Sequence, residues 1–281
     1  MKHTNLRPKP GFRIIKSSGE IEKFSEKKLR NSLRRSGLKE KDCQRISKTV
    51  SNTVLDGTTS KDIFRKTMRL VKQQSAVAAA HYSLKRALLN LGPTGYEFEH
   101  FVGKYFENQG FQTSIGVILQ GGIVRHEVDV VASKPNYNIY TECKFHNNGG
   151  KKNDIKVALY VKARWDDLKN GPDGKYLRGY ALATNTVFTK DAITYAEGVG
   201  LMLLGVNAPA GETFLDMIKK HKLYPITALV RLKKVHCKEL LKRKIILCSE
   251  LLNEDKLMLK IGMKPDEVST VIKDIHTLLG L

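Results

Sequence analysis

Apolar positions at the start of the chain follow first a strand spacing and then a helical one. Residues 13–16 and 20–24 alternate polar and apolar positions around a Ser-Ser-Gly turn, which predicts a β-hairpin. Four helices are expected next: one beginning near Glu26 behind a Ser25 cap, one over 40–54, one capped by Ser60, and one over 75–91. The Gly92-Pro93 pair that follows predicts a domain boundary.

The middle of the chain mixes both periodicities. A helical spacing of aromatic residues ends at Gly110. Strand-like runs, helical stretches and one apolar run then alternate: strands over 111–119, 127–132 and 139–145, a helix over 154–168, a strand over 178–184, a helix near 190–197 and an apolar run over 201–206. This order predicts an α/β domain over 93–208. The pattern over 209–281 is mostly helical, so we expect a multidomain chain divided as 1–92, 93–208 and 209–281.

The charge of the chain is strongly positive, +21 at neutral pH, and unevenly distributed. The basic surplus is 15 over residues 1–92, 1 over 93–208 and 5 over 209–281. A surplus of this size predicts a polyanionic partner, and DNA is the candidate; a general solubility effect is the alternative. The balanced middle segment is where acidic side chains for a metal site are available.

Several classes of protein are excluded by what the sequence lacks. No run approaches the ~20 apolar residues of a membrane span, and the N-terminus has no apolar leader, so we expect a cytoplasmic protein without a membrane partner. The four cysteines are scattered and form no CxxC pair, which argues against a zinc site or a disulfide framework. No GxxxxGK[ST] motif is present, so a bound nucleotide is expected to regulate the protein rather than drive translocation.

The clearest candidate chemistry lies on two neighbouring strands of the middle segment. If they form a hairpin that turns at Pro135-Asn136, Asp129 lies directly opposite Glu142, with Cβ atoms ~5 Å apart. Because strand side chains alternate between faces, the second strand is expected to divide into Ile139, Thr141 and Cys143 toward the core and Tyr140, Glu142 and Lys144 on the opposite face.

Two adjacent carboxylates repel each other, and a shared Mg²⁺ would relieve that repulsion. Lys144 would lie beside the same ion, where its ammonium could orient or deprotonate a water, or stabilise charge on a phosphate. The alternative is a solvent-facing strand pair with an ordinary Glu-x-Lys salt bridge. The facing acid and the preceding amphipathic helix favour a nuclease site.

These residues give segment 93–208 a resemblance to the PD-(D/E)XK superfamily, in particular to Mrr-type restriction endonucleases and Holliday-junction resolvases. The matching positions are a helix Glu99, with Glu97 as its competitor, then Asp129, Glu142 and Lys144; Val128 stands where the superfamily has its name-giving Pro. The resemblance implies an endodeoxyribonuclease that uses Mg²⁺, with Mn²⁺ as an alternative. Asp129 and Glu142 would bind the metal, Glu99 would assist through the ion or its waters, and Lys144 would position the nucleophile. It also implies a homodimer that cuts both strands.

Residues 13–90 resemble the ATP-cone, a four-helix regulatory module preceded here by a β-hairpin. The resemblance rests on Ile14-Ile15-Lys16, Gly19, Phe24 and Lys28-Leu29, and on 82–86. It implies that Lys16 and Lys28 contact the phosphates of a purine nucleotide, ATP or dATP, and that Glu22 contacts its adenosine part. The alternative is a basic helical module that contacts DNA without nucleotide.

Two further functions stay open beside a nucleotide-modulated endonuclease. One is a nucleotide-responsive DNA-binding regulator whose nuclease fold is inactive. The other is a structure-selective resolvase that acts in DNA repair.

Overall fold

The computed structural model describes residues 11–16 and 18–281, whose contacts divide the chain into two units. The first unit comprises the described residues up to Leu84 together with Lys273–Leu281, and the second is Lys85–Ile272. This division differs from the one expected at 92 and 208, because most of the C-terminal helical region belongs to the same unit as the α/β core.

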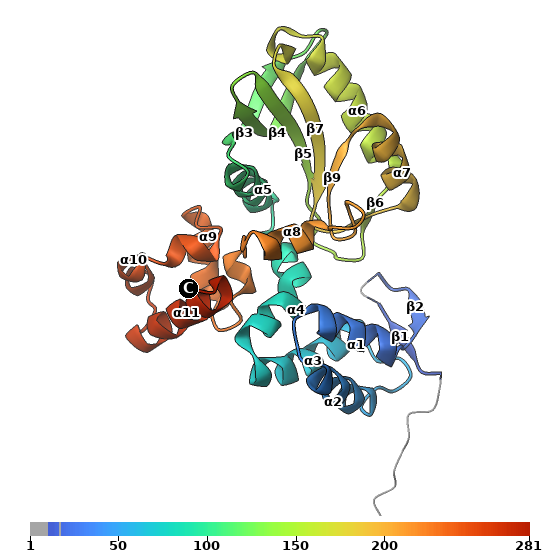
Figure 1. Ribbon diagram of the computed structural model, residues 1–281, viewed down its shortest axis with the longest axis vertical. Coiled ribbons are helices and arrows are strands. Elements are labelled where there is room, and N and C mark those ends of the chain that lie inside the picture. The colour runs from blue at the N-terminus through green and yellow to red at the C-terminus, as the bar shows by residue number, and fades with distance from the viewer. Residues whose placement is uncertain (1–10, 17) are drawn as a thin grey trace, which may run out of the picture. The chain divides into compact units, whose positions relative to one another are not determined.

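The first unit begins with the hairpin of β1 (Arg13–Ile15) and β2 (Ile21–Lys23), as predicted. The helices labelled in Figure 1 follow it: α1 (Glu26–Arg35), α2 (Glu40–Ser51), α3 (Ser60–Gln74) and α4 (Ala76–Leu89), the last of which continues into the second unit. Ser25 caps α1 by accepting from the Lys28 amide. The expected cap at Ser60 is wrong by one residue, because Thr59 accepts from the Asp62 amide.

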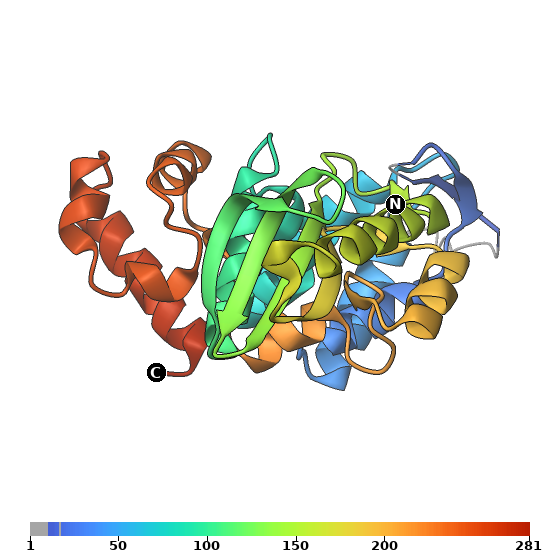
Figure 2. The ribbon, with the colours of Figure 1, turned by 90° about the horizontal axis from the view of Figure 1, so that it is seen from above.

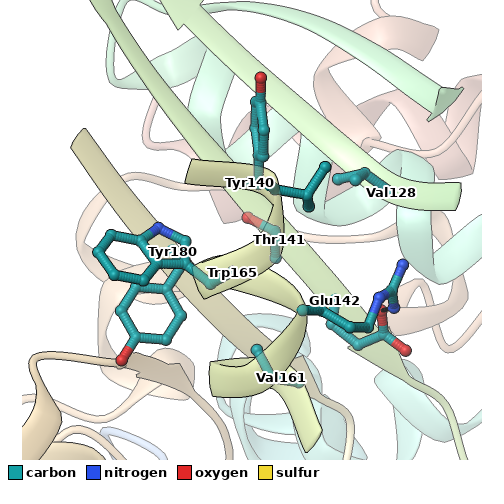
Figure 3. Close-up of a pocket in the computed structure, with 9 residues that line it drawn as sticks. Val128, Tyr140, Thr141, Glu142, Val161, Trp165 and Tyr180 are labelled. Carbon is teal, nitrogen blue, oxygen red and sulfur yellow. Dashed lines mark hydrogen bonds and ion pairs between the residues drawn. The ribbon is translucent and has the colours of Figure 1, made fainter. Parts of the chain in front are cut away.

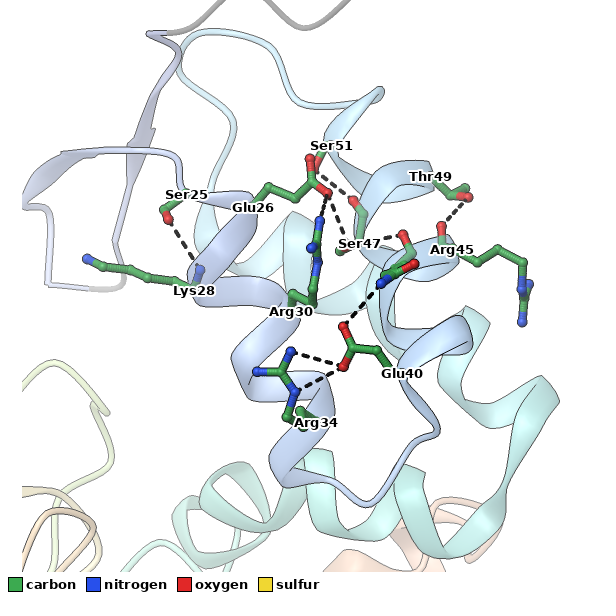
Figure 4. Close-up of polar contacts among 11 residues, drawn as sticks. Ser25, Glu26, Lys28, Arg30, Arg34, Glu40, Arg45, Ser47, Thr49 and Ser51 are labelled. Carbon is green, nitrogen blue, oxygen red and sulfur yellow. Dashed lines mark hydrogen bonds and ion pairs between the residues drawn. The ribbon is translucent and has the colours of Figure 1, made fainter.

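Helices α1 and α2 are joined by one buried interface and one polar bridge. Leu33, Ile46 and Val50 are buried where the two apolar stripes meet. Glu26 accepts from Arg30 at 2.9 Å along its own helix and from Ser47 Oγ on α2 at 3.2 Å (Figure 4). The helical spacing read from the sequence therefore does produce packed helices in this unit.

The second unit is built on a five-stranded mixed sheet with the order β3-β4-β5-β7-β9 (Figures 1 and 2). Its members are β3 (Gln112–Gln120), β4 (Arg125–Lys134), β5 (Tyr137–Lys144), β7 (Leu177–Thr184) and β9 (Met202–Leu204). The first three are antiparallel, whereas β5, β7 and β9 run parallel. The predicted α/β order is confirmed, and two very short parallel strands are added to it: β6 (Lys152–Asn153) and β8 (Val187–Phe188).

Helices cover both faces of this sheet (Figure 1). On one face, α5 (Tyr96–Asn108) packs on β3, β4 and β5 and buries Phe98, Phe101 and Phe106. On the other, α6 (Ile155–Lys169) and α7 (Lys190–Val199) pack on β7 and β9 around Tyr180 and Leu182, and the 3-10 helix η1 (Pro172–Gly174) precedes β7.

The prediction that Ile139, Thr141 and Cys143 of β5 enter the core while Tyr140 lies on the opposite face does not separate buried from exposed residues. Ile139, Tyr140 and Thr141 are all buried, at 4%, 6% and 1% exposure. The strand lies between β4 and β7, and helices cover both of its faces, so alternation does not separate core from surface here.

The remainder of the chain is helical, as predicted. Its elements are α8 (Phe214–Lys220), η2 (Ile226–Ala228), α9 (Lys234–Lys242), η3 (Cys248–Leu251), α10 (Asp255–Lys260) and α11 (Pro265–Leu279). Phe214 packs edge-on against Phe101 and Tyr105 of α5, and Lys104 of α5 lies 3.2 Å from Glu250 of η3. Among the described residues, none of the helices combines the length and apolarity that a membrane crossing requires.

Candidate active site

The β4–β5 hairpin has the register that the sequence predicts. Val130 pairs with Thr141 and Lys134 pairs with Tyr137, and Asn136 adopts a left-handed φ of 58° in the turn. The next pair in this register would be Asp129 with Glu142. The two acidic side chains are therefore brought to neighbouring positions at the end of the paired segment.

Asp129 lies at an interruption in the sheet rather than in a regular ladder. On one side the β4–β5 pairs end at Val130. On the other side, the pairs of β3 with β4 leave out Gly116, the residue opposite Asp129, whose φ is +64°. Asp129 Oδ2 instead accepts from the Cys143 amide at 2.6 Å, so its side chain fastens β4 to β5 directly beside Glu142. This bond fixes the carboxylate without neutralising it.

Glu142 is only 8% exposed and is held by two cations. Lys144 Nζ bonds one carboxylate oxygen, and the Arg164 guanidinium from α6 bonds the other. Arg164 also donates to the backbone carbonyl of Glu127 on β4. Figure 3 shows Glu142 beside Val161 of α6, in a nearly filled gap of about 20 Å³.

Arg164 is the site residue that reading the sequence missed. The sequence shows only a helix-compatible stretch, in which an arginine is a common solvent-exposed residue. Tyr160, one helical turn earlier on α6, lies on the same side of the helix. Its ring centroid is 5.8 Å from Lys144 Nζ and 5.2 Å from the Arg164 guanidinium. The sequence does not show which strand α6 packs against, and only the folded structure places Arg164 beside Glu142.

Glu99, on α5, lies in the electrostatic field of the strand carboxylates. Burial, and then the charges of Asp129, Glu127 and Glu142, raise the pKa of Glu99 to about 7. Glu97 folds back over Gly92 instead, and its Oε2 lies 3.4 Å from Thr94 Oγ1. The Glu97 carboxylate therefore has a partner of its own, although its charge also contributes to the raised pKa of Glu99.

Asp129 and Lys144 show how burial and neighbouring charge compete at this site. Burial, and then the charge of Glu142, raise the pKa of Asp129 to about 6, against partial relief from the Cys143 amide, Lys144 and Arg164. Burial alone would lower the pKa of Lys144, but the hydrogen bond and charge of Glu142 raise it above its ordinary value. Lys144 is therefore an ammonium at neutral pH, suited to orient or stabilise an anion rather than to accept a proton.

The raised pKa of Glu99 predicts a pH dependence of stability in the metal-free protein. Its folded-state pKa, about 7, exceeds the ordinary value of 4.5, so the folded protein holds this proton more tightly than the unfolded chain. This contribution to stability is fully present below about 4.5 and is lost as the pH rises through about 7. Glu99→Gln should therefore gain stability over wild type at pH 8 but not at pH 4.5, measured by urea denaturation in EDTA. The exposed Glu197→Gln is the control, and an equal gain at both pH values would contradict this prediction.

Arg164→Ala is expected to lower the free energy of unfolding by about 3 kcal/mol, because it leaves the buried Glu142 with one cation instead of two. The loss should shrink in a Glu142→Gln background, where the carboxylate is already gone. Lys162→Ala, on the same helix, removes a pair with the half-exposed Asp166 and should cost at most about 1 kcal/mol. Equal losses for the two single variants, measured by denaturant unfolding, would show that the Glu142 pair has no special weight.

The two histidines beside the site have structural partners. His126 Nε2 lies 2.7 Å from Asp167, which also accepts from the backbone amides of Ile123 and Val124. His146 Nε2 lies 3.0 Å from Asn153 Oδ1. Both rings therefore hold loops against the core.

In the first unit, the residues expected to contact nucleotide lie together. Lys16 Nζ is 2.9 Å from Glu22 and 3.3 Å from Glu20, and Lys28 Nζ is 3.4 Å from Glu22. The hydrogen bond that Lys16 donates to Glu22 is the main cause of the raised pKa of Lys16 and of the lowered pKa of Glu22. Two ammonium groups thus flank one carboxylate at the hairpin and the start of α1.

The donor set of the sheet site fits a divalent cation bound by few protein ligands. Within residues 11–16 and 18–281, no three His, Cys, Asp or Glu side chains are grouped closely enough to hold a metal ion unaided. Mg²⁺ commonly takes one or two carboxylates and completes its shell with water and substrate phosphate. Asp129 and Glu142 supply two such carboxylates, and a bound cation would offset the burial and the charge of Glu142 that raise the pKa of Asp129.

Comparisons with known proteins match the α/β core and the C-terminal helical region to two different families. Residues 92–218 match the Mrr_cat restriction endonuclease family, and residues 224–279 match the AF1548-like, C-terminal family. Both matches begin at or after residue 92, so neither addresses the ATP-cone resemblance of the N-terminal residues.

Two relatives align over most of their own length. An uncharacterized protein of Archaeoglobus fulgidus is 33% identical over 182 residues, which are 64% of this chain and 100% of that protein. The crystal structure of AF1548, a protein of unknown function, has 31% identity and a TM-score of 0.53 and covers 66% of this chain and 99% of its own. The MspJI restriction endonuclease, solved with a 27-mer oligonucleotide, is a far weaker match at 13% identity and a TM-score of 0.37, over 83% of this chain and 49% of its own.

Proposed function

The chain belongs to the family of AF1548-like proteins and contains a restriction-endonuclease-like domain, and from this premise we propose that it is a Mg²⁺-dependent DNA endonuclease. The observation that carries the proposal is the convergence of Glu99, Asp129 and Glu142 with Lys144 at one end of the β4–β5 pair. Three acids and one ammonium in a half-buried site suit hydrolysis of a phosphodiester. The +21 charge of the chain suits a polyanionic substrate.

Each side chain has a distinct role in the proposed reaction. Asp129 and Glu142 would hold the divalent ion, and Glu99, whose pKa is raised by both of these acids, would assist through the ion or its waters. When bound, the ion neutralises phosphate oxygens and lowers the pKa of water. Lys144 stays protonated and orients the nucleophile against the phosphate. Arg164 is a positioning residue that keeps Glu142 aligned through its second oxygen.

The decisive experiment is cleavage of supercoiled plasmid by the purified protein in Mg²⁺, in Mn²⁺ and in EDTA. Nicking or linearisation that requires the metal is expected. DNA binding without cleavage in either metal would favour a DNA-binding regulator with an inactive nuclease fold. Rates on four-way junctions and on linear duplexes of the same sequence then separate a structure-selective resolvase from a general endonuclease. Light scattering of the free and DNA-bound protein tests the homodimer that paired strand cleavage requires.

Modulation by a purine nucleotide is the second component of the proposed function. It is supported by the grouping of Lys16 and Lys28 on either side of Glu22, where phosphates could replace the carboxylate as their partner. A nucleotide can regulate cleavage only if it binds two states of the protein unequally.

Lys16→Ala is expected to weaken ATP or dATP binding about 10-fold, because one charge-assisted phosphate contact is removed. Isothermal titration calorimetry measures this directly. Lys61→Ala, at an exposed position of α3, serves as the control. No detectable heat with either nucleotide in the wild-type protein would leave a basic DNA-contacting module as the function of this unit.

A further inference from the structure

A second recess lies within the second unit, outside the group of carboxylates. It is a pocket of about 720 Å³, a volume typical of ligand-binding sites. Ile226, Leu229 and Leu241 give it an apolar floor, and Asn90 and Asn147 add amide groups. The candidate active site uses none of these residues.

One side of the pocket is formed by a row of lysines. Lys234, Lys238 and Lys242 of α9 are four residues apart, so they share one face of the helix at intervals of about 6 Å. All three side chains are exposed. Residues 219–244 contain ten Lys and Arg against one acid, Glu239, so the field at this face is strongly positive.

The pocket and the candidate active site share two segments of backbone. Glu97, in the pocket lining, lies two residues before Glu99 on α5, and Asn147 lies three residues after Lys144 in the loop that follows β5. Asn147 Nδ2 donates to the Pro93 carbonyl at 3.1 Å and so ties the two segments together. Residues of the pocket lining and of the candidate active site are therefore carried on the same two stretches of chain.

The position of α9 relative to these segments is fixed by contacts on both sides of the pocket. Thr227 Oγ1 donates to the Ala87 carbonyl at the end of α4 at 2.8 Å. On the α5 side, Lys104 pairs with Glu250, and Ile226 donates to Ile246 at 2.9 Å to close the loop that follows α9. The lysine row is therefore presented by the folded unit rather than by a free tail.

We propose that the α9 lysine face, Lys234, Lys238 and Lys242, binds the sugar–phosphate backbone of the DNA that passes through the candidate active site. This role rests on the proposed function for the identity of the polymer. The row extends about 12 Å, and one DNA strand carries a phosphate about every 3.4 Å, so each lysine can meet a different phosphate. Such contacts position the duplex for cleavage and add no base specificity.

The test compares two triple variants from the same region. Lys234→Ala/Lys238→Ala/Lys242→Ala removes the α9 lysine face. Lys256→Ala/Lys260→Ala/Lys264→Ala removes the same charge from exposed positions that do not line the pocket.

Binding to a fluorescein-labelled DNA duplex is measured by anisotropy in EDTA between about 50 and 200 mM salt. The α9 variant lacks three phosphate contacts, so its affinity should depend less on salt. Over this range the affinity of the wild type should fall about 40-fold more than that of the α9 variant. The control triple should keep the wild-type salt dependence.

Equal salt dependence of the two triple variants, or no DNA binding by the wild type, overturns the assignment. Circular dichroism checks that both variants are folded. Cleavage is assayed separately in Mg²⁺ at saturating protein, where the α9 variant should recover most of the wild-type rate. A wild type that binds DNA through this face but never cleaves it contradicts the proposed endonuclease alone and leaves the DNA-binding face supported.

Discussion

Lys144→Ala is expected to reduce the rate of Mg²⁺-dependent DNA cleavage about 100- to 1,000-fold while leaving DNA affinity nearly unchanged. Lys144 bonds Glu142 and lies within the field of Asp129, and both acids keep it protonated. Its loss removes one positive charge from the position where a phosphate would gain negative charge. Single-turnover cleavage at saturating protein separates this effect from binding.

The appropriate control for Lys144→Ala is Lys175→Ala, since Lys175 is an exposed lysine of the same unit before β7. That variant should cut DNA at the wild-type rate. Lys144→Arg keeps the charge but not the shape, so an intermediate rate would show that position matters as well as charge. Wild-type cleavage by purified Lys144→Ala would remove this residue from the proposed reaction.

Asp129→Asn is expected to lower Mg²⁺-dependent cleavage by about 1,000-fold or more, since a lost metal ligand costs several kcal/mol of transition-state stabilisation. The amide oxygen can still accept from the Cys143 amide, so the hairpin should stay intact. Without metal, the variant should be more stable than wild type above about pH 6, because burial and Glu142 disfavour the ionised acid.

Thermal unfolding with and without Mg²⁺ measures both consequences of Asp129→Asn. Wild type should gain stability on adding Mg²⁺ at pH 8 and much less at pH 5, where Asp129 and Glu99 hold protons. The variant should gain little at either pH. Asp191→Asn, at an exposed position of α7, is the control. An Mg²⁺-dependent gain that survives in Asp129→Asn would place the metal elsewhere.

Much of the candidate site could be predicted from the chain because its parts are local. The register of β4 and β5 follows from one short turn, so the position of Asp129 beside Glu142 was fixed by counting residues from Pro135-Asn136. Lys144 follows two positions along the same strand. Glu99 lies in the first turn of a helix whose aromatic spacing is unambiguous in the sequence.

Other features depended on partners distant in sequence. Arg164 was missed because its partner, Glu142, is 22 residues away on another element. Tyr140 was expected on the face opposite the core residues, yet it is buried, because helices cover both faces of β5. The lysines of α9 look like an ordinary solvated helix face until the pocket beside them is seen.

The sequence by itself determined the order of the main helices and strands, the register of the β4–β5 hairpin and the placement of Asp129, Glu142 and Lys144 near one another, because periodicity and turn chemistry act over a few neighbouring residues. The tertiary structure alone decided which helix covers which face of β5 and that Arg164 holds the second oxygen of Glu142. Burial and electrostatic coupling are properties of residues brought together from distant positions, and no local pattern encodes them.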